Sequence, residues 1–458
     1  MIEIREESPT PGLLTIMREM RIFILIWFGQ IVSVTGSGLT NFALDIWVLQ
    51  KTESVTQFAI LVMCNTLPFV LISPIAGVLT DRFSRRWLMI VSDFCAGLCT
   101  LSMALLYASG KLEIWHIYLA TACSNGLLGI QWPSYNASTS LLVPQKHLGR
   151  ANGMNQLADG FARLVAPIMA AFLLGTIHLN GIIIIDFSTM LFALVPLLLL
   201  PFPELNTIAQ KTEETAPNSF WLELSQGWIY LKQRPGLLGV VLFSGVINFL
   251  VGVFDVTAIP LGLTLASVTV TGTVFSIACS GLVISGTAMS IWGELRRYIN
   301  ILFVGISLAG IFLMIAGLRP SLFLFTPASF FFFLTVPAIN TSIFSILQKK
   351  VVPEVQGRVF ALQGALASIC LPLGYVVAGS LADHIFEPLM ASDGALANSI
   401  GQIIGTGEGR GLGLLLILVG GIAILFALVA YLYPSLRLVE EELPNVVTGY
   451  IATRTYDK

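Results

Sequence analysis

The chain alternates long apolar stretches with short polar or basic segments from residue 22 onward. A helix needs about 20 mostly apolar residues to cross the hydrocarbon core of a membrane. Twelve stretches meet this requirement, at residues 22–49, 56–79, 87–109, 114–140, 150–176, 180–200, 236–262, 267–291, 298–317, 321–347, 358–384 and 412–434. The pattern therefore predicts an all-α membrane protein with twelve transmembrane helices.

Composition supports a lipid environment. Charged residues make up 11% of the 458 positions and hydrophobic residues 55%, whereas about a quarter of a soluble domain is charged. The six cysteines fall inside the predicted spans without metal-ligand spacing, so we expect neither disulfides nor a metal site. No basic surface suited to nucleic acid is present, and the lipid bilayer is the expected partner.

Basic residues are distributed unequally between alternate loops. Nineteen of the 24 lysines and arginines fall on the side that holds both termini. The other side has Lys51, Lys111, Arg319 and Arg410, and Arg163 lies within a span. Cytoplasmic loops carry the excess of positive charge, so both termini are predicted to be cytoplasmic. Residues 1–20 have no apolar core, and the first span is expected to act as the targeting signal.

The two halves of the chain repeat one another. Pro133–Ser138 is echoed by Pro337–Ser342 at an offset of 204, and Asp45 by Asp255 at an offset of 210. Such matches in constant order indicate two six-helix repeats. The predicted divisions are an N-terminal half at 1–201, a cytoplasmic linker at 202–235, a C-terminal half at 236–434 and a cytoplasmic tail at 435–458.

Two parallel six-helix repeats, with substrate bound between them at mid-depth, are typical of the major facilitator fold. The loop after the second span resembles that superfamily's signature G-x-x-x-D-R-x-G-R-R, except that Ser84 stands where the signature has its second glycine. Its matching residues are Gly77, Asp81, Arg82, Arg85 and Arg86. The resemblance implies that this loop helps to close the cytoplasmic side, and an acid with a basic cluster can latch one helix end to a neighbour. The alternative is that the arginines are simple positive-inside anchors.

Further features resemble the macrolide-efflux group of that superfamily. They are Leu141–Pro144, Gly227–Gly236, Gln348–Pro353 with Gly357–Val359, and Pro372–Gly374 followed by Ala382–Asp383. The resemblance implies a drug/proton antiporter, with near relatives that export siderophores and peptide natural products. The fourth span contains Ser124 and Asn125 but no basic residue, although many proton antiporters of the superfamily carry one there.

Charged residues inside spans need a partner, a water-filled cavity or a functional role. Asp45 and Asp255 lie in the outer parts of the first and seventh spans and are candidate proton carriers. Their alternative role is that of hydrated charges at the helix ends. Asp159 and Arg163 are four residues apart and can pair on one helix face, either as a structural pair or as part of a substrate or proton site. Arg163 is thus a candidate substitute for the missing cation of the fourth span.

Uncharged polar side chains also occur inside the spans. The candidates for orienting a ligand are Gln30, Asn41, Asn65 and Asn248. Hydrogen bonding between helices is the alternative for each of them.

The sequence therefore predicts a secondary active transporter that exports a lipophilic or amphipathic small molecule, such as a macrolide-like drug, siderophore or peptide natural product. Exchange for protons in a bacterial inner membrane is expected. No phosphate-binding G-x-x-x-x-G-K-[ST] stretch occurs, so we expect neither ATP nor another cofactor. The alternatives are a nutrient importer or facilitator and a non-transporting membrane receptor. An enzyme is not expected, because no nucleophile, base and metal are grouped together.

Overall fold

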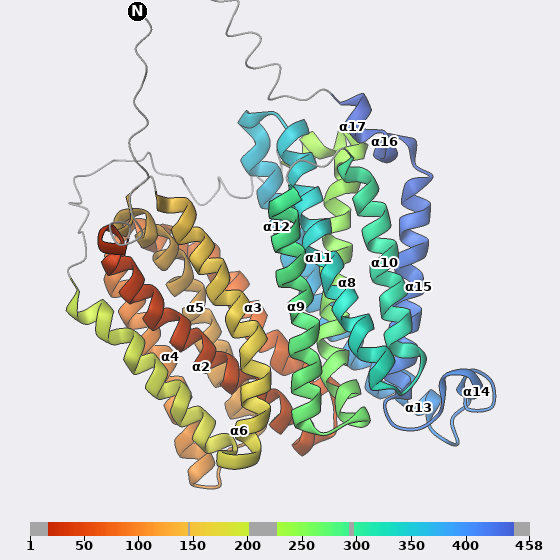
Figure 1. Cartoon of the computed structure of the whole chain (residues 1–458). Coiled ribbons are helices and arrows are strands. Elements are labelled where there is room, and N and C mark those ends of the chain that lie inside the picture. The colour runs from red at the N-terminus through yellow and green to blue at the C-terminus, as the bar shows by residue number, and fades with distance from the viewer. Residues whose placement is uncertain (1–16, 145–146, 201–226, 293–296, 444–458) are drawn as a thin grey trace, which may run out of the picture. The chain divides into compact units, whose positions relative to one another are not determined.

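The computed structural model describes residues 17–144, 147–200, 227–292 and 297–443, and these form helices joined by turns (Figure 1). Eleven helices exceed 20 residues: α2 (Arg21–Thr52), α3 (Val55–Arg82), α4 (Arg85–Ala108), α5 (Ile114–Leu142), α6 (Leu148–Leu199), α8 (Pro235–Leu265), α9 (Val268–Trp292), α10 (Tyr298–Leu318), α11 (Leu322–Lys350), α12 (Pro353–Leu381) and α15 (Arg410–Tyr431). Short helices are α13 (Glu387–Met390), α14 (Gly401–Ile404), α16 (Pro434–Arg437) and α17 (Val439–Glu442). The predicted all-α fold is confirmed.

The helix count agrees with the predicted twelve spans. Ten stretches of the described chain are long and apolar enough to cross a membrane. One of them, Gly160–Leu199, contains a break at His178 with φ 58° and ψ −177°, so it corresponds to the predicted spans 150–176 and 180–200. The remaining predicted span, 114–140, corresponds to α5, whose 29 residues include many small polar side chains.

Two proline residues explain where helices begin. Pro235 and Pro353 open α8 and α12, because proline lacks the N–H that would be unpaired in the first turn and its φ already suits a helix. α12 consequently begins five residues before the predicted start at 358.

The chain packs as two compact units. The first comprises the described residues within 1–41, 67–166 and 177–206. Within it, α4 packs against α5, and a core that includes Ile26, Met89, Tyr135 and Leu197 joins α2, α4, α5 and α6. A second cluster around Phe23 and Val143 lies beside it.

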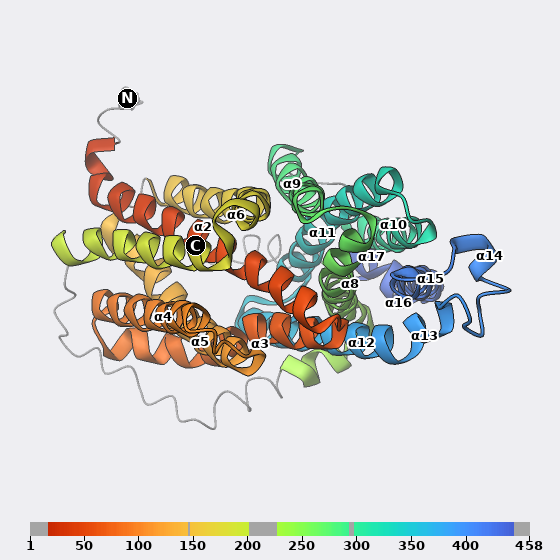
Figure 2. The same ribbon diagram turned by 90° about the horizontal axis from the view of Figure 1, so that it is seen from below.

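The second unit comprises the described residues within 42–66, 167–176 and 207–458. α8 lies at its centre, surrounded by α9, α10, α11, α12 and α15 (Figure 2). The unit also includes the end of α2, the start of α3 and a short part of α6, so these three segments pack with the C-terminal helices. The predicted boundaries of the two repeats stay a prediction.

Glycines bring α10 and α15 into close contact. An ideal Cβ at Gly420 would lie 2.4 Å from the carbonyl oxygen of Gly310, and one at Gly317 would lie 2.2 Å from that of Gly413. Small residues let membrane helices approach at backbone distance, where van der Waals packing replaces the missing hydrophobic driving force.

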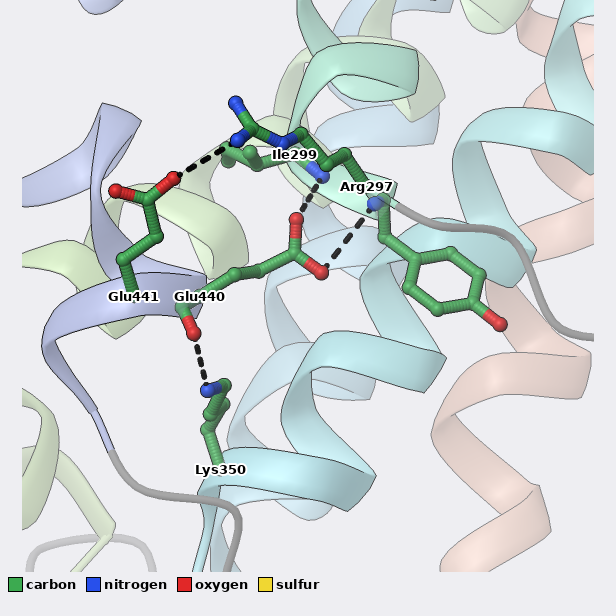
Figure 3. A network of polar contacts seen from close by, with 6 residues as sticks. Arg297, Ile299, Lys350, Glu440 and Glu441 are labelled. Carbon is green, nitrogen blue, oxygen red and sulfur yellow. Dashed lines mark hydrogen bonds and ion pairs between the residues drawn. The ribbon is translucent and has the colours of Figure 1, made fainter.

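The C-terminal segment forms hydrogen bonds with the start of α10 and the end of α11 (Figure 3). The Glu440 carboxylate accepts hydrogen bonds from the backbone N–H groups of Tyr298, at 3.3 Å, and Ile299, at 2.8 Å. Lys350 Nζ donates to the carbonyl oxygens of Glu440, at 2.5 Å, and Leu443. Residues 434–442 thus form an ordered brace within the second unit.

Candidate transport site and gates

Asp45 and Asp255 both lie in the second unit, where their charges interact. Asp45 lies seven residues before the end of α2 and Asp255 ten residues before the end of α8, which corresponds to about 10 and 15 Å of helix. Their carboxyl groups are close enough to interact electrostatically. The buried Asp45 Oδ1 has no hydrogen-bond partner among the described residues. Asp45 thus combines an unsatisfied acceptor with an electrostatic interaction with a second acid.

The end of the second unit that contains the start of α3 is here named the distal end. There the side chain of Asp383 meets the first turn of α3. Its carboxylate accepts hydrogen bonds from Ser54 Oγ at 2.6 Å, Val55 N at 3.0 Å and Thr56 N at 2.8 Å. A carboxylate at a helix N-terminus is favoured by the helix dipole and by the unpaired N–H groups of the first turn.

A second distal contact joins α6 and α9. An ideal Cβ at Gly272 would lie 2.6 Å from the carbonyl oxygen of Pro167 and 2.8 Å from Ala171 Cβ. The two helix backbones therefore touch at this glycine. The contact at Asp383 holds α3, and the contact at Gly272 holds α6, against C-terminal helices in this unit.

Part of the predicted gate motif has a visible role in the first unit. Arg86 Nε donates to the carbonyl oxygen of Leu197 and Arg86 Nη2 to that of Leu198, both at 2.7 Å. These carbonyls belong to the last turn of α6, where a cation satisfies free acceptors and suits the negative end of the dipole. Arg85 is half-buried.

The other members of that motif lie at the end of α3. The structure describes only the helical backbone of Gly77, Asp81 and Arg82. The gating role predicted for the motif therefore stays a prediction.

The predicted pair on α6 is only half visible. The Arg163 side chain is exposed, whereas that of Asp159 lies outside the described residues. Their pairing, and the proposed substitution of Arg163 for a cation on α5, stay predictions.

The predicted polar positions are found in different settings. Gln30 is buried in the first unit, where Gln131 Nε2 donates to its Oε1 at 2.8 Å and its own Nε2 donates to Asp93 Oδ2 at 3.3 Å. This network links α2, α4 and α5. Asn248 is half-buried, and its Nδ2 donates to the Ser244 carbonyl oxygen at 2.8 Å within α8. Asn41 and Asn65 are half-buried.

Sequence reasoning singled out no role for Asp383. The signal available was its place at the end of a helix, where the dipole disfavours an acid. An acid at such an unfavourable position indicates that its carboxylate interacts with a different helix. Gln131 was missed as well, because nothing in the sequence shows that it faces Gln30.

The long apolar helices, with their charged groups directed to one another and to helix ends, define a polytopic helical membrane protein. The family model for the Major Facilitator Superfamily matches residues 26–375. The chain belongs to this superfamily, as its motifs predicted. Membership of a transporter family also confirms the expectation that the chain is not an enzyme.

Two relatives and one solved structure refine the comparison. Macrolide efflux protein A of Streptococcus pyogenes is 28% identical over 377 residues, which cover 79% of this chain and 90% of the relative. Macrolide efflux protein A of Enterococcus faecalis is 28% identical over 67% of this chain and 95% of its own length. The crystal structure of a bacterial homologue of the human lysosomal transporter Spinster matches with a TM-score of 0.66 at 13% identity, covering 90% and 96% of the two chains. The structural likeness supports the fold alone.

Proposed function

We propose that this major facilitator exports a lipophilic or amphipathic small molecule in exchange for protons. The similarity to macrolide efflux proteins along most of their length supports export. The observation that carries the proton proposal is the electrostatic interaction of Asp45 with Asp255 beside a buried carboxylate oxygen, because two interacting acids cannot both carry charge at low cost where water is excluded. Binding one proton relieves this repulsion, and the unpaired Asp45 Oδ1 is the atom to which we assign it.

The driving force is adequate for such exchange. One elementary charge that crosses a potential of 100 mV supplies about 2.3 kcal/mol. That free energy supports roughly a 50-fold gradient of a neutral substrate.

The test is flux of a labelled macrolide, a siderophore and a lipopeptide in proteoliposomes, with and without an imposed pH gradient. We expect the gradient to drive flux of at least one compound by the wild type. Asp45→Asn should abolish the gradient-driven part while substrate exchange without a gradient persists, because only the proton site is lost. Asp255→Asn should show the same separation.

The matched control is Asp186→Asn, which removes another carboxyl group from within a span. Asp186 is 5% exposed and accepts a hydrogen bond from Ser37 Oγ at 3.0 Å, which marks it as a packing residue. Flux that ignores both the gradient and Asp45→Asn contradicts the antiport proposal. Accumulation in cells that rises on expression would instead indicate import, and binding without any flux would indicate a receptor.

We further propose a bacterial cell membrane as the location, with both termini in the cytoplasm. The unequal distribution of lysine and arginine between the two sides supports this orientation. It places the distal end outside the cell. The test of this orientation is labelling of Arg319→Cys by a membrane-impermeant thiol reagent in intact cells, in a background without the six native cysteines. We expect labelling in intact cells, and labelling only after lysis contradicts the orientation.

A further inference from the structure

We propose that Asp383 is a positioning residue that holds the distal end of the transporter closed by capping α3, and that its contacts break when this end opens. The proposal rests on the proposed transport function, in which the two repeats must separate at one end at a time. α3 comes from the N-terminal half of the chain and α12 from the C-terminal half. The contact between them lies wholly within the second compact unit.

Asp383 completes the hydrogen bonding of the first turn of α3. Its carboxylate takes the N–H groups of Val55 and Thr56. Ser54 Oγ, itself a donor to Asp383, accepts from Gln57 N at 3.2 Å, and the Ser54 carbonyl oxygen accepts from Phe58 N at 3.2 Å. Every N–H of this turn thus has an acceptor. Without Asp383, two of them lose theirs, and only water can replace it.

Asp383 ends a stripe of α12 that faces α3. Tyr375, Gly379 and Asp383 recur at intervals of four residues, which places them on one helix face. Thr56 Oγ1 donates to the Gly379 carbonyl oxygen at 3.0 Å, and an ideal Cβ at Gly379 would lie 2.6 Å from Ala59 Cβ. Below them, the hydroxyl groups of Thr66 and Tyr375 lie 3.4 Å apart. The small side chain at 379 lets α3 come close enough for the carboxylate to reach its N-terminus.

The local backbone also distinguishes this position. α12 ends in a π-helical turn at Ala382–Phe386, which contains Asp383. Single π-helical turns within α-helices occur frequently at functional sites. Ordinary α-helix continues from Glu387.

Glu387 provides a built-in comparison. Four residues after Asp383, its carboxylate accepts hydrogen bonds from Gly409 N at 3.2 Å and Leu412 N at 3.0 Å, and so caps α15. Both partners belong to the C-terminal half of the chain. The two acids have the same chemistry, but only the contact of Asp383 joins the N-terminal half to the C-terminal half. Opening the distal end must therefore break the cap at Asp383 and leave the cap at Glu387 intact.

Electron paramagnetic resonance distances between spin labels at Glu53→Cys and Arg319→Cys test this proposal. Both positions are exposed at the distal end. The full-length protein, free of its six native cysteines, is measured in proteoliposomes without substrate or gradient. Asp383→Ala should raise the ratio of the long-distance to the short-distance population by roughly fivefold to tenfold, as expected for loss of one helix cap. Asp383→Asn should give a smaller rise, since its amide oxygen still accepts one of the bonds.

Glu387→Ala is the matched control and should leave the distance distribution as in the wild type while lowering thermal stability. An unchanged distribution in Asp383→Ala, or an equal change in Glu387→Ala, would overturn the proposal. If Asp383→Ala does not fold, Asp383→Asn and Ser54→Ala decide the question on the same criterion. Ser54→Ala removes the bond to Asp383 and the bond from Gln57 N, but leaves the Asp383 carboxylate on Val55 N and Thr56 N. The measurement needs neither a known substrate nor protons, so its outcome is separate from that of the macrolide flux.

Discussion

Removing the carboxylate of Glu440 should loosen the start of α10. In Glu440→Ala, the N–H groups of Tyr298 and Ile299 lose their acceptor, and Arg297, which precedes the helix, offers no side-chain cap in its place. Loss of a cap costs about 1 kcal/mol, and loss of the charge at the helix N-terminus costs about a further 0.3 to 1 kcal/mol. We therefore expect Glu440→Ala to lower the free energy of unfolding by about 1 to 2 kcal/mol.

The neighbouring acid is the control for this prediction. Glu441 pairs with Arg297 at 3.3 Å, but the two side chains are 58% and 66% exposed. An exposed ion pair contributes about 0.2 to 1 kcal/mol, so Glu441→Ala should cost less than Glu440→Ala and should lose its effect at high salt. The assay is reversible unfolding of the purified protein in mixed micelles, followed by tryptophan fluorescence. Equal losses for the two variants would refute the assignment of Glu440 as the cap of α10.

Two further predictions concern helix ends and helix packing. Arg86→Ala should lower the free energy of unfolding by about 1.5 to 3 kcal/mol, because the carbonyl oxygens of Leu197 and Leu198 lose a charged donor. Arg86→Lys should restore part of this loss in the same unfolding assay. Equal losses for the two variants would contradict the assignment. Gly420→Ala should destabilise by about 1 to 3 kcal/mol because its Cβ would meet the Gly310 carbonyl oxygen at 2.4 Å. Gly421→Ala is its control, since nothing lies within 4 Å of the added Cβ. We expect this variant to gain about 0.5 to 1 kcal/mol in the free energy of unfolding, from helix propensity alone. An equal change in both variants would contradict close packing of α10 on α15.

The fold was predictable from the sequence because a membrane imposes a simple rule on every span. About 20 apolar residues are required whatever the neighbours are, so the start of α8 at Pro235 and the break at His178 between predicted spans both follow from local composition. The signature around Arg86 identified the superfamily for a similar reason, since its residues are contiguous.

The site was predictable only in part. Asp45 and Asp255 were singled out because an acid inside a span is costly wherever it lies, and in the structure their charges interact. The partners of Asp383 are 327 to 329 residues away, and Tyr298 is 142 residues from Glu440. Such pairings depend on how helices pack, and no local pattern specifies that packing.

Three acids cap the starts of helices in the described chain, and they differ in whether the cap must break during transport. α10 and α15 lack a side-chain cap of their own and receive Glu440 from α17 and Glu387 from α13. Both caps join segments that follow the predicted linker, and each provides an acceptor for N–H groups that the first turn of a helix leaves unpaired. Asp383 uses the same chemistry on α3, but its carboxylate and its partners lie on opposite sides of the predicted linker. A cap at a helix end exchanges readily with water, since both the carboxylate and the N–H groups are hydrated once they part. A bond of this kind suits a contact that must be remade in every transport cycle.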